Sequence, residues 1–218
     1  MKTIGKTFLL LAFGLCAYAQ QWEVGGIGGV GFLDTVHVNT ATAGSGNAGF
    51  STGAVAGAFI GSYLNAHWSG EIRYEFFDSS LKLSGDGSSA TFSGVAHAVH
   101  YDLIYHFNRK HSPVQFFVAL GGGMKIFDGT GAPNAYQPLQ QFGYFTQTHQ
   151  IEPMLSAGGG ISYKLGDHLY FRTEIRDFVS PFPKNVIAPA VAQPSGQQAS
   201  FGKVLQNLVP MVGIEYLF

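Results

Sequence analysis

The chain is poor in charge, nearly free of cysteine and without a long apolar segment. Only 11% of its 218 residues are charged, whereas an average soluble domain has about 25%. The one cysteine is Cys16, so we predict neither disulfide bonds nor thiolate chemistry beyond the N-terminal segment. The formal net charge is -1, which offers no basic surface for nucleic acid or for electrostatic attachment to anionic lipid.

The distribution of apolar residues points to strands. Past the N-terminal segment, no run approaches the roughly 18 uninterrupted apolar residues of a membrane-spanning helix. Hydrophobic residues nevertheless make up 46% of the chain. Apolar residues spread through alternating strands are what a transmembrane β-barrel requires.

The N-terminus has the pattern of a secretory signal peptide. Two lysines precede an apolar run over residues 8–18, and Ala17 and Ala19 form a small-x-small cleavage site. The run is shorter than a membrane-spanning helix, which needs about 20 residues. Cys16 would permit a lipid anchor, but the bulky Leu15 before it disfavours one.

The last stretch, residues 206–218, alternates with a period of two. Ile214, Tyr216 and Phe218 share an apolar face, and Glu215 lies on the other. A chain that ends on an aromatic residue in this way resembles the terminal strand of bacterial outer-membrane β-barrels. The resemblance implies that Ile214, Tyr216 and Phe218 are an assembly signal, read by the barrel-assembly machinery.

Seven more segments have the period of a strand. They cover residues 21–33, 50–64, 68–76, 91–107, 114–127, 150–163 and 169–176. For the segment 50–64 the alternation of alanine and glycine leaves the facing open. Long connections alternate with short ones, as in outer-membrane barrels whose short turns face the periplasm.

The long connections are predicted as loops without regular structure. They cover residues 34–49, 78–90, 128–149 and 177–204. An aromatic residue near the short-turn end of each strand predicts a girdle at one membrane interface. The girdle comprises Trp22, Tyr63, Trp68, Phe107, Phe116, Tyr163, Phe171 and Phe218.

Two runs near the C-terminus carry a family resemblance. Residues 158–163 (GGGISY) and 172–178 (RTEIRDF) resemble the sixth and seventh strands of the OmpA-type outer-membrane β-barrel family. We therefore expect an all-β fold: an eight-stranded antiparallel up-and-down transmembrane β-barrel at 20–218, behind a cleavable signal peptide at 1–19. The expected location is the cell outer membrane. A soluble lipocalin-like barrel is the alternative fold.

The alternation predicts a charged barrel interior. The predicted interior residues are Glu23, Glu71, Arg73, Glu75, His100, Asp102, Lys125, Glu152, Arg172, Glu174, Arg176 and Glu215, with His106 near the rim. An eight-stranded barrel is just wide enough for side chains to fill it. We therefore expect a packed network of ion pairs, since buried charges need partners. The excess of acids leaves a narrow cation-preferring pore as the alternative.

The histidines could carry chemistry, but we predict no metal site and no catalysis. His100 and His106 lie about 20 Å apart along one strand, too far to share an ion. A hydrogen bond from His100 to Asp102 is the expected outcome. His97, near Ser93, is the best candidate for a lipid-modifying enzyme, but no recognisable catalytic motif accompanies it.

These observations predict a non-enzymatic outer-membrane barrel with a structural or surface-interaction role and no cofactor. Its expected partners are membrane lipid, the assembly machinery and an extracellular ligand bound through loops 128–149 and 177–204. We expect a monomer that does not bind nucleic acid. The alternatives are a narrow passive porin-like pore for ions or small solutes and, third, a lipid-modifying enzyme.

Overall fold

The computed structural model describes residues 21–40, 44–108, 112–129, 137–145, 148–189 and 200–218. The predicted signal peptide, with Ala17 and Ala19, lies outside these residues. Within the described part of the chain, no helix has the length and apolar character needed to cross a membrane.

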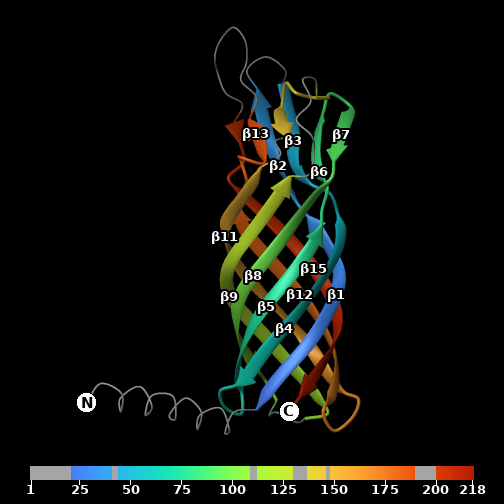
Figure 1. Ribbon diagram of the computed structural model, residues 1–218, viewed down its shortest axis with the longest axis vertical. Helices are drawn as coiled ribbons and strands as arrows, with labels where there is room; N and C mark the ends of the chain where they lie inside the picture. The colour runs from blue at the N-terminus through green and yellow to red at the C-terminus, as the bar shows by residue number, and fades with distance from the viewer. Residues whose placement is uncertain (1–20, 41–43, 109–111, 130–136, 146–147, 190–199) are drawn as a thin grey trace, which may run out of the picture.

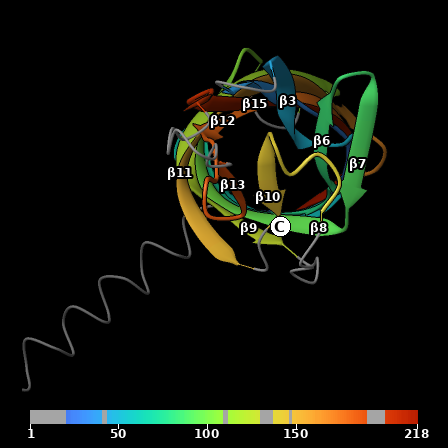
Figure 2. The same ribbon diagram turned by 90° about the horizontal axis from the view of Figure 1, so that it is seen from above.

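Eight strands form a closed antiparallel barrel (Figures 1 and 2), which confirms the predicted fold. They are β1 (Trp22–Leu33), β4 (Gly53–Tyr63), β5 (Trp68–Asp78), β8 (Gly94–His106), β9 (Val114–Gly129), β11 (His149–Lys164), β12 (Leu169–Pro181) and β15 (Val204–Leu217). The first strand pairs with the last, and the backbones of Trp22 and Phe218 exchange hydrogen bonds of 3.1 and 2.9 Å. The sheet therefore has no open edge.

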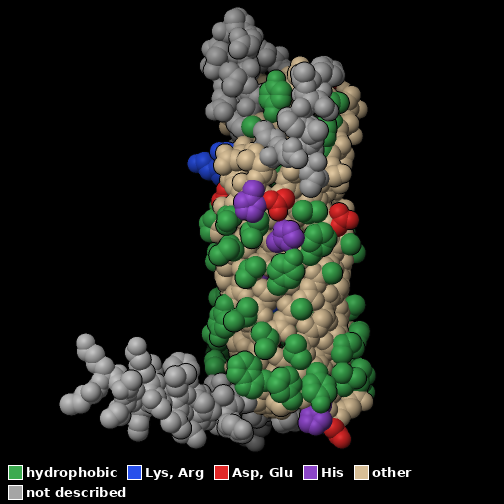
Figure 3. Space-filling model, in the orientation of Figure 1, with side chains coloured by type: hydrophobic (Ala, Val, Ile, Leu, Met, Phe, Trp, Pro, Cys, Tyr) green, Lys and Arg blue, Asp and Glu red, His purple; other side chains and the backbone are tan. Residues whose placement is uncertain are grey.

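The barrel is apolar outside and charged inside. Ile72 is 58% exposed on the outer face of β5, whereas its neighbours Glu71 and Arg73 are at most 1% exposed. Apolar side chains are spread over the visible wall of the barrel in Figure 3, and charged side chains appear on it mainly near its two ends. A soluble protein would show the opposite arrangement, whereas a barrel surrounded by lipid requires this one.

The facing of β4, left open by its sequence, is defined by three large inward residues. Val55, Phe59 and Tyr63 are each 3% exposed. The Tyr63 hydroxyl donates a hydrogen bond of 3.0 Å to Oε1 of Gln115 inside the barrel. Placing Tyr63 in the outer aromatic girdle was therefore wrong, because the strand turns it inward.

Two of the four predicted loops are wrong, because most of the described residues in 34–49 and 78–90 form strands. A five-stranded sheet in the order β14-β2-β3-β6-β7 rises from the end of the barrel opposite the C-terminus (Figure 1). Its strands are β2 (Thr35–Thr40), β3 (Gly44–Phe50), β6 (Leu81–Gly85), β7 (Ser88–Phe92) and β14 (Ser200–Phe201).

These strands were missed because they are short and rich in glycine and serine, which weaken the periodic signal. A tight turn joins β6 to β7. Asp86 and Gly87 have positive φ angles of 51° and 74°, as the central residues of a hairpin turn of this length require.

The other two predicted loops are partly ordered. β10 (Gly143–Phe145) pairs with β13 (Ile187–Pro189), and β9 and β12 extend into the predicted loops as far as Gly129 and Pro181. Seen along the barrel, β10 and β13 lie over its mouth (Figure 2). We call β2, β3, β6, β7, β10, β13 and β14 together the cap.

One apolar core joins the cap to the adjacent half of the lumen. It includes Phe77 and Phe178 inside the barrel, Leu83 and Ile187 in the cap, and Phe142 in the turn directly before β10. Phe142 lies against Gly46, where an added Cβ would meet the ring at 3.0 Å. The cap is therefore a packed structure, and this half of the lumen is filled with apolar side chains.

We predict that Phe142→Ala loosens the cap while the barrel stays folded. Truncating a buried phenylalanine costs about 3–5 kcal/mol, and here the loss falls on the cap. Limited proteolysis of the protein in lipid vesicles should show faster cleavage within the cap. Tyr144→Ala is the matched control, because Tyr144 lies two residues further along the chain, in β10, and is 40% exposed. Equal cleavage of both variants would contradict the packed cap.

Candidate functional site

The lumen contains most of the predicted interior charges. Eleven of the twelve predicted residues are at most 3% exposed. The exception is Glu152, which is only partly buried. It lies opposite Lys125 on the neighbouring strand, and its carboxylate accepts a hydrogen bond from the side chain of Gln150.

Arg73 is the centre of the charge network. Its guanidinium donates to Glu71 at 2.8 Å and to Glu75 at 3.0 Å, both on its own strand β5. It also forms an ion pair with Glu174 on β12. Since β5 and β12 do not pair in the sheet, this contact ties opposite walls of the barrel together across the lumen.

Two more arginines extend the network along β12. Arg172 donates to Glu71 at 2.7 Å and to Glu174 at 3.2 Å. Arg176 donates to Asp102 at 2.6 Å. Each of these three guanidinium groups contacts at least one carboxylate, so the arginines have the partners that burial requires. The buried carboxylate of Glu23, by contrast, has no hydrogen-bond partner.

His100 lies between two carboxylates. Its Nδ1 is 2.9 Å from Asp102, which confirms the expected hydrogen bond, and its Nε2 is 2.9 Å from Glu75. His106, at the other end of β8, contacts the Ser69 hydroxyl at 2.9 Å. Among the described residues, no group of three or more His, Cys, Asp or Glu side chains could hold a metal ion.

Lys125 stands apart from the arginines, in the apolar half of the lumen. Its Nζ lies 4.3 Å from the ring centre of Phe77 and 5.3 Å from that of Phe127. With the Asn207 amide oriented so that its oxygen faces Lys125, Nζ donates to it at 2.6 Å. Aromatic faces and one amide thus surround this cation.

Phe59 is an interior residue that the sequence did not reveal. Its ring lies 5.1 Å from the guanidinium carbon of Arg73 and 4.6 Å from that of Arg172. The aromatic face thus fills the space between two like charges. The spacing of Val55, Phe59 and Tyr63 could have revealed it, because residues four apart lie on the same face of a strand.

His97, the candidate for catalysis, lies on the outer wall at the cap end. Its Nδ1 is 2.8 Å from the Tyr74 hydroxyl, and its Nε2 is 3.9 Å from Asp128. Ser93 is exposed in the connection before β8. The contacts of His97 are thus with Tyr74 and Asp128, and the described hydrogen bonds do not join it to Ser93.

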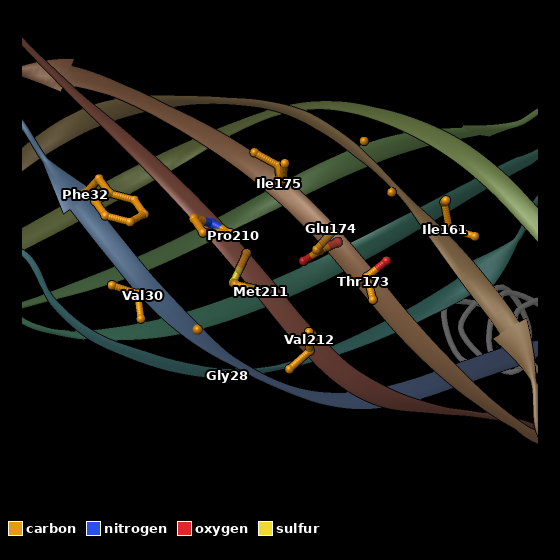
Figure 4. Close-up of a pocket in the computed structure, with 13 residues that line it drawn as sticks. Gly28, Val30, Phe32, Ile161, Thr173, Glu174, Ile175, Pro210, Met211 and Val212 are labelled. Atoms are coloured by element: carbon orange, nitrogen blue, oxygen red, sulfur yellow. The ribbon is translucent and has the colours of Figure 1, made fainter.

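The lipid-facing wall of β1, β15, β12 and β11 contains a groove of about 580 Å³ (Figure 4). We call it the wall groove. Its sides include Val30, Phe32, Ile161, Ile175 and Val212. Gly28, Gly159, Pro210 and Thr173 are the small outward residues between them.

Pro210 lies where the pairing between the first and last strands of the barrel is interrupted. Proline has no backbone N–H to donate to a neighbouring strand. The pairing of β1 with β15 runs as far as Gly29–Met211 and resumes at Phe32–Leu208. The wall groove therefore lies beside a short interruption of the ladder that closes the barrel.

The closed barrel, its apolar exterior and its charged lumen define a transmembrane β-barrel. The family model described as "Outer membrane protein beta-barrel domain" matches residues 7–198. The chain belongs to this family, and its location is the outer membrane. A comparison with curated proteins gives no match.

Several solved structures of other proteins are similar to this chain. Neisserial surface protein A (NspA) is 11% identical, with 91% of this chain and 97% of that chain covered and a TM-score of 0.54. The N-terminal barrel of Pseudomonas aeruginosa OprF is 13% identical, with coverages of 91% and 97% and a TM-score of 0.48. Ail of Yersinia pestis is 10% identical, with coverages of 90% and 99% and a TM-score of 0.45.

We predict that Arg73→Met destabilises the barrel by about 3–5 kcal/mol, because it leaves buried carboxylates without their partner. Urea unfolding in lipid vesicles, followed by tryptophan fluorescence, measures the change. Lys164→Met is the control, since Lys164 lies at the end of β11 and takes part in none of the described ion pairs. Equal stability of the two variants would contradict the role of the network.

Proposed function

We propose that this protein is a structural and surface-interaction barrel that holds a folded cap at the cell surface. The observation that carries the proposal is the filled lumen. A network of ion pairs occupies the half near the C-terminus, and an apolar core fills the half below the cap. Short turns face the periplasm in this family of folds, so the cap points outward.

A filled lumen supports the structural role over the pore. A hydrated ion would have to displace bonded guanidinium and carboxylate groups and then pass a layer of aromatic side chains. Burial of an unpaired charge in such surroundings costs several kcal/mol. The excess of acids over bases among the predicted interior residues favours a cation pore.

We predict that the purified protein gives no reproducible conductance steps in planar bilayers. The reason is that ion-paired side chains and an apolar layer occupy the lumen. A known porin, measured in the same bilayers, is the positive control. Reproducible steps that disappear on changing Glu71 or Arg73 would establish the pore instead.

The cap is the part of the protein that we propose binds an extracellular ligand. Segments 128–149 and 177–204 contribute β10 and β13, which pair above the lumen. Rigid scaffolds that hold loops in place are where binding commonly occurs. The barrel would thus anchor and orient this surface.

We do not assign catalysis to His97. Its ring contacts Tyr74 and Asp128, and the lipid-modifying alternative needs a nucleophile beside it. If His97→Ala abolished a lipid modification in cells, the enzyme would replace our proposal.

We further propose that Ile214, Tyr216 and Phe218 direct assembly by the barrel-assembly machinery. All three point outward at the end of β15 and are 44–58% exposed. In this position a partner can reach them before the barrel closes.

Phe218→Ser should lower the amount of assembled protein in the outer membrane several-fold, since the terminal aromatic contact is lost. Quantitative immunoblotting of the folded and unfolded forms measures the amount of assembled protein. Phe107→Ser is the matched control: Phe107 is 59% exposed, against 58% for Phe218, and lies at the same end of the barrel. If both substitutions reduced assembly equally, the signal would not reside in the terminal residue.

A further inference from the structure

The wall groove is a concave site in a surface that lipid should cover evenly. Phe32 and Ile161 lie at opposite ends of it, with Pro210, Val212 and Thr173 between them (Figure 4). Its lining is apolar apart from the Thr173 hydroxyl and the inward residue Glu174. An apolar groove on the lipid-facing wall stays dry, so hydrocarbon must fill it.

Gly28, in the groove, has space in front of its α-carbon. A Cβ added there would meet its nearest atom, the Val55 carbonyl oxygen, at 3.7 Å, which is ordinary contact. At the adjacent inward Gly29 a Cβ would collide with Pro210 and Met211. Packing within the chain therefore explains Gly29 but not Gly28. Because Gly28 has no side chain and free space in front of it, another molecule can approach its backbone closely.

A smaller pocket continues the groove toward the cap. It shares Phe32 with the wall groove and is also lined by Leu208, Asp34 and Gln206. The Gln206 amide donates to Asp177 at 2.6 Å at this level. The combined path thus has an apolar body and a polar end at the outer rim, the polarity of a lipid of the outer leaflet.

We propose that the wall groove binds one acyl chain of an outer-leaflet lipid, with the lipid's polar end beside Asp34 and Gln206. This proposal goes beyond the function proposed above and does not depend on it. The acyl chain lies over Gly28 and Thr173 and covers the interruption of the strand pairing at Pro210. It therefore fills the wall where strand pairing is incomplete.

A second copy of the chain fits the groove less well. A two-fold dimer through this face would place the same concave surface on both sides. Two grooves facing each other leave a void, and atoms lining a void lose their dispersion contacts. An acyl chain is narrow and flexible enough to fill the concavity without one.

Photocrosslinking tests the proposal. The full protein is reconstituted in phosphatidylethanolamine and phosphatidylglycerol vesicles with a trace of phosphatidylethanolamine that carries a mid-chain diazirine. After illumination, mass spectrometry should find about fivefold more label on Val30, Ile175 and Val212 than on Val99 and Tyr101 of the opposite wall, a preference of about 1 kcal/mol. Even labelling of both walls would overturn the proposal.

Two leucine substitutions distinguish lipid binding in the groove from general contact of lipid with the barrel wall. Gly28→Leu fills the groove and should bring the labelling ratio close to one. Gly26→Leu is the matched control on the same strand and face. A Cβ there would meet its nearest atom at 4.0 Å, and Gly26 does not line the groove. Equal loss of label in both variants, or none in Gly28→Leu, would overturn the assignment.

The position of the diazirine tests the orientation. A diazirine near the headgroup should label Phe32 and Leu208, and one at the chain end should label Ile161. The reverse order would overturn the outer-leaflet assignment. Crosslinks between two copies of the protein through the groove would overturn the proposal that a lipid occupies it. If Gly28→Leu fails to fold, as judged by migration of the unheated protein in gels, Thr173→Leu tests the same loss of label.

Discussion

The structure depends on the ion pairs that join opposite walls of the barrel through its lumen. Lipid outside the wall offers no partner to a charge, and an eight-stranded barrel leaves no wide water channel inside. The charged side chains of β5 and β12 must therefore satisfy one another. Arg73 and Arg172 do so by sharing Glu71 and Glu174, so the network replaces the hydrophobic core of a soluble domain in this half of the molecule.

The other half of the lumen is held by ordinary apolar packing, which continues into the cap. The ring of Phe50, at the base of the cap, lies 5.2 Å from that of Phe127 in the barrel. Phe77 packs edge-on against Phe178 at 5.8 Å. The barrel thus changes from a polar to an apolar interior along its axis, and the cap closes the apolar end. This arrangement gives the cap a rigid base.

The barrel could be predicted from the sequence because alternation on β5, β12 and β15 is strict and the charges mark one face. The cap could not, since β2, β3, β6 and β7 are short and their glycines and serines hide the period. The inward Tyr63 was misplaced because alanine and glycine obscure the facing of β4. The wall groove depends on residues from four strands, so it becomes visible only when closure sets their register.

The most direct test of the paired lumen is the exchange of arginine side-chain protons with water. In the structure the Nε–H groups of Arg73 and Arg172 donate to Glu75 at 3.0 Å and to Glu174 at 3.2 Å. Nuclear magnetic resonance of the labelled protein in lipid nanodiscs should show these two signals with slow solvent exchange. Exchange as fast as that of a free arginine would show a hydrated, unpaired lumen and contradict the account.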